Sequence, residues 1–322
     1  MFGDILDAYE RIRPVVRETP VEYSAALGAW LKLEHAQKTG SFKFRGASNK
    51  IAMLTAEQAA AGVVTASNGN HGLGVAAAAE ARGIAAEVFV SSHVSPAKAR
   101  RIEAHGARIH CAGDDPLTAE LAARRAAAES GRVFISPYND RDVMAGQGTI
   151  AVELLRQLPE VEAVYVAVGG GGLIGGIGAF LKEAKPSVEI VGCWPENSPV
   201  MWECMKAGAV VEVPERPTLS ESTAGGLEPG SVTLEICKSV VDRAVFVSEN
   251  QIAENMRKTL EVEHWLVEGA AAVAVAAQQK EKGKYKNPAV VLCGRNLSPE
   301  AYEKVFGPRI HTDSRGSEVL SV

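Results

Sequence analysis

Short apolar runs alternate with alanine-rich helical stretches through most of the chain, and this alternation constrains the fold more than any other sequence feature. The clearest run, at 163–168, is apolar throughout and is followed by a glycine loop and a helical stretch. A strand that is apolar on both sides must be covered on both faces, which is typical of parallel sheets between layers of helices. The sequence therefore predicts the α/β class. Strands are predicted at 62–66, 86–90, 109–111, 132–135, 163–168, 189–193 and 289–292, and helices at 71–82, 96–105, 116–130 and 173–183.

The composition excludes several classes of protein. Of the 322 residues, 46% are hydrophobic and 23% are charged, which is ordinary for a globular chain and too apolar for a disordered one. The formal net charge of -5 is not the basic signature of a nucleic-acid-binding protein, so we expect no nucleic-acid partner. No stretch of about 18 uninterrupted apolar residues occurs, so we expect no membrane-spanning helix. At roughly 150 residues per domain, the length predicts about two domains.

The five cysteines are odd in number, scattered, and never spaced as a CxxC pair. This usage argues against a disulfide framework or a structural zinc site. We therefore expect a reducing, cytoplasmic location. The cysteines are Cys111, Cys193, Cys204, Cys237 and Cys293.

The first of three glycine-containing segments is KTGSFKFRGA, at 38–47. Ser41 is expected to cap a helix that begins at Phe42, which places Lys43 in the first helical turn. Apolar neighbours and the positive end of a helix both disfavour an ammonium group there. Lys43 is therefore a candidate Schiff-base nucleophile, and the alternative is an ordinary solvated helix lysine.

The second segment, SNGNHG at 67–72, lies between a predicted buried strand and a predicted helix. Small polar residues at this place leave backbone N–H groups free at the start of the helix, which makes a ready anion site. The alternative is a plain turn carrying an Asn-Gly signal.

The third segment contains four consecutive glycines, at 169–172, after the apolar strand and before a helix. Glycines let the backbone approach an anion closely, so this segment is a candidate phosphate cradle. The segment also fits a G-x-G-x-x-G dinucleotide pattern, with Glu189 or Glu196 as the acid that binds the ribose. An NAD-dependent dehydrogenase therefore stays open as an alternative, although this pattern alone is weak.

Taken in chain order, these segments resemble the threonine/serine dehydratase family. The matching runs are TGSFKFRGA, SNGNHGLGVA, GQGTI, GGGGLIGG, VEGAAAV and CGRN, spread over about residues 4–294. Members of that family are pyridoxal-phosphate enzymes of the tryptophan-synthase-β fold, fold type II, with serine racemases among their relatives. The resemblance implies pyridoxal 5'-phosphate as cofactor, an amino acid as substrate, and a homodimer. It also implies two open parallel-sheet α/β domains: a large one from 1–49 plus 143–322, and a small one inserted at 50–142.

The resemblance also assigns a role to each segment. Lys43 would be the catalytic lysine that holds the cofactor, and Glu268 would lie near the cofactor ring. Cys293 would face the pyridine nitrogen. Without the resemblance, a solvated helix acid and a core thiol would be the preferred interpretations of Glu268 and Cys293. The other implied contacts are Phe42 with the pyridine ring, Asn70 with the ring hydroxyl, Gly169, Gly170, Gly171, Gly172 and the Leu173 N–H with the phosphate, and Ser67, Asn68, Gly69 and His71 with the substrate carboxylate.

Three positions depart from the family's patterns. Leu73 stands where Gln is common in GNHxQG, and Arg295 stands at the second glycine of the S/C-G-G-N loop. Gly225 replaces the acid of T-x-A-D-G, a segment that supplies carboxylate ligands to a divalent ion in the metal-activated members. Glu221 remains there, but hard cations require several oxygen ligands, so a metal site stays an open question.

The implied reaction is β-elimination of L-threonine or L-serine, giving a 2-oxo acid and ammonia. A thiol at Cys293 favours loss of a leaving group over transamination, because it does not stabilise a pyridinium ion as a carboxylate would. Racemisation is less favoured, because related serine racemases place a Ser where this chain has Asn68. If Arg295 faces the substrate, 3-hydroxyaspartate becomes an alternative substrate, and the departures together also leave phenylserine or a hydroxyectoine-derived acid open. A non-catalytic protein that binds pyridoxal phosphate is the remaining alternative.

Overall fold

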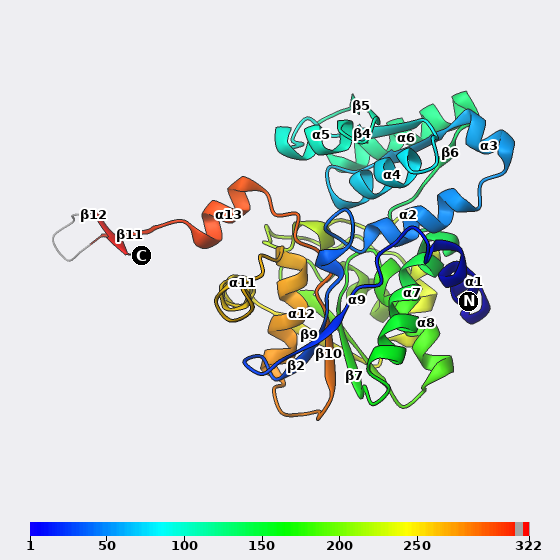
Figure 1. The fold of residues 1–322 in the computed structure, drawn as a ribbon. Coiled ribbons are helices and arrows are strands. Elements are labelled where there is room, and N and C mark those ends of the chain that lie inside the picture. Colours follow the sequence, from blue (N-terminus) through cyan, green and yellow to red (C-terminus); the bar gives the residue numbers. More distant parts are fainter. Residues whose placement is uncertain (313–317, 322) are drawn as a thin grey trace.

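The structure, a computed structural model, describes residues 1–312 and 318–321 and contains two largely parallel sheets (Figure 1). The larger sheet has the order β1-β2-β10-β7-β8-β9, in which β1 and β2 pair antiparallel and the other neighbours pair parallel. The smaller sheet, β5-β4-β3-β6, is parallel throughout. The predicted α/β fold of two parallel-rich sheets is confirmed. The strands are β1 (Val21–Ser24), β2 (Ala29–Lys32), β3 (Val63–Ala66), β4 (Ala86–Val90), β5 (Arg108–Cys111), β6 (Val133–Phe134), β7 (Ala163–Ala167), β8 (Glu189–Pro195), β9 (Arg243–Val247), β10 (Pro288–Val291), β11 (Arg309–Thr312) and β12 (Glu318–Ser321).

Helices cover both faces of the larger sheet. Helix α12 packs on β7, β8, β9 and β10, while α8 packs on β7 and β8 from the other side, together with α7 (Figure 1). The first ten residues of α12, seven of them alanine or glycine, are all buried, because small side chains let the helix lie close to the strands. The helices are α1 (Phe2–Ile12), η1 (Glu34–Ala36), α2 (Lys43–Ala52), α3 (Ala56–Ala61), α4 (Asn70–Glu80), α5 (Pro96–Glu103), α6 (Pro116–Ser130), α7 (Arg141–Gln157), α8 (Gly172–Ala184), α9 (Val200–Ala207), η2 (Glu221–Thr223), α10 (Val232–Val240), α11 (Glu249–Glu263), α12 (Gly269–Lys280) and α13 (Pro299–Phe306).

The smaller sheet has a separate apolar core on each face. Successive residues of a strand point to opposite faces, so Val63 packs with the alanines of α4 while its neighbour Val64 packs against Ala123 of α6. Both faces of the sheet are therefore covered by helices, as continuous apolar strands require.

Helices α2 and α7 cross at close range between the two sheets. A Cβ on Gly146 would lie 2.6 Å from the Cα of Gly46, and a Cβ on Gly46 would lie 2.7 Å from the Val143 carbonyl oxygen. This crossing therefore requires glycine on both helices. We propose the domain division of 1–49 plus 143–322 against 50–142, whose two boundaries fall inside α2 and α7.

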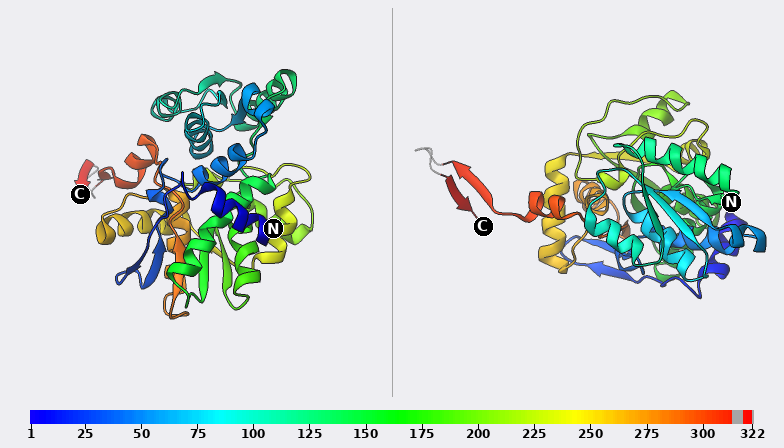
Figure 2. Two further views of the ribbon diagram at one scale, coloured as in Figure 1. Left: turned by 45° about the vertical axis from the view of Figure 1, so that its right-hand side comes forward. Right: turned by 90° about the horizontal axis from the view of Figure 1, so that it is seen from above.

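The C-terminal segment leaves the body of the molecule. Helix α13 packs on α11, and beyond it the strands β11 and β12 project to one side in every view (Figures 1 and 2). Within the part of the chain that the structure describes, no helix is long and apolar enough to cross a membrane.

Candidate active site

The loops that follow the carboxyl ends of four parallel strands converge on Lys43. These loops are 67–71 after β3, 136–139 after β6, 169–172 after β7 and 293–296 after β10. The carboxyl ends of parallel strands are where α/β proteins place their ligands. Hydrogen bonds and close contacts join the loops to one another and to the start of α2.

Helix α2 begins at Lys43 with Phe42 as its N-cap residue, so the prediction of a helix capped by Ser41 is wrong. Ser41 instead forms an isolated antiparallel bridge with Gly294, and the Phe42 N–H donates to the Cys293 carbonyl at 3.1 Å. The buried Ser41 hydroxyl has no hydrogen-bond partner within the described residues. These two pairings hold Lys43 beside the loop that follows β10.

The Lys43 side chain is half-buried, and its Nζ donates to the carbonyl of Pro137 at 2.6 Å. The same atom lies 5.3 Å from the centre of the Phe42 ring. Burial lowers the pKa of Lys43 to about 8, although the negative charge of the nearby Glu268 acts to raise it. Lys43 is therefore an amine that can act as a base or nucleophile close to neutral pH.

The glycine loop after β7 presents backbone rather than side chains. A Cβ on Gly170 would lie 2.4 Å from the Tyr138 ring, and Gly171 has a φ of +83°. Helix α8 then opens with Gly172 and Leu173, whose N–H groups have no partner within the helix. The loop thus offers N–H donors and the positive end of a helix, which suit a phosphate group.

Glu268 lies at the centre of a hydrogen-bonded cluster at the start of α12. Its carboxylate accepts from Asn70 Nδ2 at 2.9 and 3.0 Å, from Ser222 Oγ at 2.8 Å, and from the Asn296 N–H at 3.0 Å. Asn296 Nδ2 donates in turn to Asn70 Oδ1 at 2.6 Å. A Cβ on Gly294 would lie 2.7 Å from the Glu268 carboxylate, so the loop after β10 requires glycine there. The cluster fixes the orientation of the Asn70 amide.

The turn after β3 is held by its own polar side chains. Ser67 Oγ accepts from the Gly69 N–H at 3.1 Å. Asn68 Nδ2 donates to Ser91 Oγ at 2.7 Å, and Asn68 Oδ1 accepts from the Ser91 N–H at 2.8 Å. Both ends of the Asn68 amide are therefore engaged with Ser91.

His71 is buried in the first turn of α4. Its Nε2 lies 3.0 Å from the Ile135 carbonyl, so Nε2 carries the proton and donates, while the buried Nδ1 has no partner within the described residues. Burial, and then the charge of Lys43, lower the pKa of His71 to about 3, so the ring is neutral. A contact between His71 and a substrate carboxylate would therefore come from its backbone N–H.

The Cys293 thiol is buried, with 3% of its surface exposed. Burial, and then the negative charge of Glu268, raise the pKa of Cys293 well above its ordinary value. The thiol therefore stays protonated and uncharged at neutral pH.

Three residues at the site were not predicted individually from the sequence. Asn296 belongs to the CGRN run, and its place just after a buried strand was the available signal. Ser222, which bonds to Glu268, stands at the first position of the segment compared with T-x-A-D-G, and that run was its available signal. Tyr138, which packs on the glycine loop, carries no local signal, because only the tertiary fold brings it to the site.

The segment that contains Glu221 and Gly225, for which a metal site was left open, makes polar contacts with other parts of the protein. Glu221 lies 3.4 Å from Lys98 Nζ, and the Gly225 N–H donates to Glu215 Oε2 at 3.0 Å. Over residues 1–312 and 318–321, no group of three or more His, Cys, Asp or Glu side chains is placed to hold a metal ion.

The dinucleotide alternative does not fit the structure. The large sheet runs β1-β2-β10-β7-β8-β9, and not in the 3-2-1-4-5-6 order of a dinucleotide-binding sheet. The carboxylate of Glu189 is already paired with Arg243 and Tyr285, so it is not free to bind a ribose.

The residues at the site fit pyridoxal phosphate. The glycine loop and the start of α8 suit its phosphate, and the Lys43 amine, with its lowered pKa, suits covalent attachment to its aldehyde. Two largely parallel sheets carrying such a lysine and such a cradle define a pyridoxal-phosphate enzyme of the tryptophan-synthase-β type. The chain belongs to the pyridoxal-phosphate dependent enzyme family, which matches residues 12–294.

Known proteins of this family match most of the chain. It is 40% identical over 310 residues to the L-threonine ammonia-lyase of Thermotoga maritima, covering 94% of this chain and 77% of that protein. Maize serine racemase superposes with a TM-score of 0.88 at 31% identity, covering 94% of this chain and 95% of that chain. The processed threonine deaminase isoform 2 of Solanum lycopersicum superposes with a TM-score of 0.87 at 30% identity, covering 94% and 91%.

Proposed function

We propose that this protein is an ammonia-lyase, or dehydratase, that converts L-threonine and L-serine to a 2-oxo acid and ammonia. The observation that carries the proposal is the pairing of the Lys43 amine, whose pKa is lowered to about 8 chiefly by burial, with the uncharged thiol of Cys293. The similarity to an L-threonine ammonia-lyase over most of the chain supports the same activity.

Lys43 supplies the base for this reaction. Pyridoxal phosphate, when bound, supplies the electron sink that accepts the electron pair of the Cα–H bond. Lys43 would hold the cofactor and, as a free amine, would take the Cα proton of the substrate. The β-hydroxyl would leave Cβ with its bonding electron pair and take a proton from the Lys43 ammonium, which gives water and restores the neutral amine. The released enamine tautomerises and adds water, which gives the 2-oxo acid and ammonia.

Cys293 decides between elimination and transamination in this proposal. An uncharged thiol beside the pyridine nitrogen does not stabilise a proton on it, as a carboxylate would. The electron sink is then weaker, so departure of the β-hydroxyl becomes the better outcome. Transamination is disfavoured for the same reason.

Asn68 argues for elimination over racemisation. Inversion at Cα requires an acid on the face opposite Lys43, and an amide cannot exchange a proton in that way. Asn68 is also held by Ser91 at both ends of its amide group. We therefore expect Asn68→Ser to introduce conversion of L-serine to D-serine. Chiral chromatography of the reaction mixture measures this conversion.

Arg295 bears on the choice of substrate. Its side chain is exposed, and its N–H donates to the Gly40 carbonyl at 2.9 Å. If Arg295 reaches the substrate, a second carboxylate would favour binding. Arg295→Gly, which restores the family's usual glycine, should then lower kcat/KM for 3-hydroxyaspartate and leave that for L-threonine unchanged.

A panel of β-hydroxy amino acids tests the proposal. L-Threonine, L-serine, 3-hydroxyaspartate and phenylserine are incubated with the holoenzyme, and 2-oxo acid and ammonia are measured together. Equal yields of the two products from L-threonine or L-serine support an ammonia-lyase. Racemised amino acid without 2-oxo acid, or no turnover of any member, contradicts it.

We also propose a cytoplasmic homodimer. The five cysteines are all free thiols, which supports a reducing location. A two-stranded hairpin standing alone is marginally stable in water, so the projecting β11–β12 hairpin supports contact with a second copy (Figure 2). Sedimentation at several concentrations tests the dimer, and a monomer at all of them would contradict it.

A further inference from the structure

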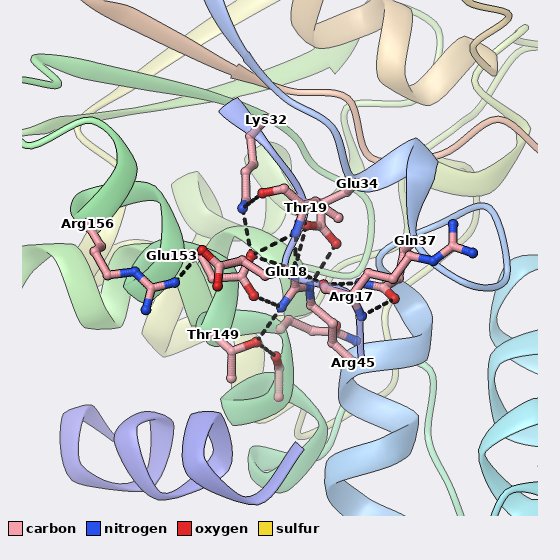
Figure 3. Close-up of polar contacts among 12 residues, drawn as sticks. Arg17, Glu18, Thr19, Lys32, Glu34, Gln37, Arg45, Thr149, Glu153 and Arg156 are labelled. Carbon is pink, nitrogen blue, oxygen red and sulfur yellow. Dashed lines mark hydrogen bonds and ion pairs between the residues drawn. The ribbon is translucent and has the colours of Figure 1, made fainter. Parts of the chain in front are cut away.

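Four charged side chains form a network that is buried beneath the start of α2 and takes no part in the proposed chemistry (Figure 3). Lys32 comes from β2, Glu34 from η1, Arg45 from α2 and Glu153 from α7. None of their side chains is more than 2% exposed. Buried charges are costly unless they are paired and hydrogen-bonded, so such a network calls for an explanation.

Arg45 is the hub of this network. Its Nε and Nη2 donate to the two carboxylate oxygens of Glu34 at 2.8 and 2.9 Å. Its Nη1 and Nη2 donate to the two carboxylate oxygens of Glu153 at 2.7 and 2.8 Å. Further contacts run to Thr149 Oγ1 at 3.2 Å and to the Arg17 carbonyl at 3.2 Å. One guanidinium therefore makes bidentate hydrogen bonds to two carboxylates, a geometry that lysine cannot reproduce.

A second cation completes the network. Lys32 Nζ donates to Glu153 Oε2 and to the Thr19 carbonyl, each at 2.6 Å. Thr19 Oγ1 donates to Glu34 Oε1 at 2.5 Å. The formal charges of the two cations and the two carboxylates sum to zero.

The place of Arg45 on its helix is unfavourable for a cation. It is the third residue of α2, where the positive end of the helix opposes a guanidinium. Successive helical residues are about 100° apart, so Arg45 points to nearly the opposite side of the turn from Lys43. The guanidinium is therefore anchored in the protein interior while the Lys43 amine reaches the site from the other side.

We propose that Arg45 is a positioning residue, which fixes the direction of the Lys43 amine by clamping the first turn of α2 to Glu34 and Glu153. The inference rests on the proposed role of Lys43. It concerns geometry rather than charge, because the formal charges of the network sum to zero and the charged side chain that acts on the ionisation of Lys43 is Glu268. Loss of the clamp should therefore slow proton removal without moving its pH dependence.

The matched pair Arg45→Lys and Arg243→Lys tests this inference. Arg243 also pairs with two carboxylates, those of Glu281 and Glu189. It lies on β9, however, and these contacts involve none of the loops at the site. Arg45→Lys should lower kcat for L-threonine by about tenfold or more, with KM changed by less than about twofold and an unchanged pH midpoint. Arg243→Lys should lower the melting temperature and leave kcat unchanged.

Hydrogen exchange gives a readout that does not depend on activity. Amides in the first turns of α2 should exchange faster in Arg45→Lys than in the wild type, and at the wild-type rate in Arg243→Lys. Unchanged exchange together with unchanged kcat in a folded Arg45→Lys protein would overturn the inference. A wild-type holoenzyme that does not turn over L-threonine would instead count against the proposed function, while the exchange result would still test the clamp.

A milder substitution keeps the inference testable if Arg45→Lys does not fold. Thr149→Val removes one acceptor of Arg45 at nearly constant side-chain volume, and Thr149→Ser retains it. Thr149→Val should lower kcat without raising KM, and Thr149→Ser should restore the wild-type kcat. Equal kcat values in the two variants would contradict the proposed role of the clamp.

Discussion

The ionisation of Lys43 can be measured directly in the cofactor-free protein. Burial lowers its pKa to about 8, against an ordinary value of 10.5, while the negative charge of Glu268 limits the shift. A lysine amine reacts only when neutral, and it becomes neutral as the pH rises through its pKa. An amine with a pKa of about 8 is roughly 9% neutral at pH 7 and roughly 91% neutral at pH 9.

The rate of acetylation of Lys43 by trace acetic anhydride should therefore rise about tenfold between pH 7 and pH 9 and then level off. Peptide mass spectrometry reports each lysine separately. Lys50, on the same helix, is the internal control. Burial acts to lower its pKa, but hydrogen bonds to Asp140 and Asp142 outweigh burial and raise it above 10.5, so its labelling should keep rising.

Glu268→Gln extends the experiment. It removes a negative charge that raises the pKa of Lys43, so the labelling midpoint should move below that of the wild type. A Lys43 midpoint near 10.5 would show that burial does not lower the pKa of Lys43, and a midpoint that does not respond to Glu268→Gln would show that Glu268 does not act on it.

Three further predictions follow from individual contacts. Gly170→Ala places a methyl group 2.4 Å from the Tyr138 ring, so it should cost about 1–3 kcal/mol and weaken binding of pyridoxal phosphate in a fluorescence titration, whereas Gly3→Ala, with nothing within 4 Å, should do neither. Burial is the main cause that lowers the pKa of His35 to about 4, so stability should be lost as the pH falls below 6.5, by about 2 kcal/mol at pH 5 through this group. In urea unfolding, the His35→Phe protein should lose less free energy of unfolding than the wild type as the pH falls from 6.5 to 5. Cys293→Asp should lower the rate of 2-oxo acid formation by more than about tenfold, or at least about 1.4 kcal/mol in the barrier, while Cys293→Ser should have a mild effect.

Each of these predictions has an outcome that contradicts it. Normal cofactor affinity in Gly170→Ala would show that the loop can move away from Tyr138. An acid-stability profile unchanged by His35→Phe would assign the loss to other groups. A Cys293→Asp enzyme with the wild-type rate would show that Cys293 is not beside the pyridine nitrogen.

The elements that could be predicted from the sequence are those whose signal is local. The strand at 86–90 and the helix at 116–130 have the predicted bounds, because the first is a continuous apolar run and the second begins with Pro and ends before Gly131. The start of α2 was misplaced by one residue. Ser41 pairs with Gly294, more than 250 residues away, and no local pattern shows that pairing.

In the candidate site, too, only the residues with a local sequence signal could be predicted. The segments around Lys43, Asn70 and the glycine loop carry their own sequence signals. Not all of their partners do, because Tyr138 reaches the glycine loop only through the tertiary fold. The ion pairs of the Arg45 clamp could not be predicted for the same reason, because Arg45 and Glu153 are indistinguishable in sequence from solvated helix charges.

Reduction of the holoenzyme with borohydride, followed by peptide mapping, determines which lysine holds the cofactor. We expect one pyridoxyl group, attached to the peptide that contains Lys43, and none on the Lys43→Ala protein. A pyridoxyl group on another lysine of the wild-type protein, or normal turnover of L-threonine by Lys43→Ala, would contradict it.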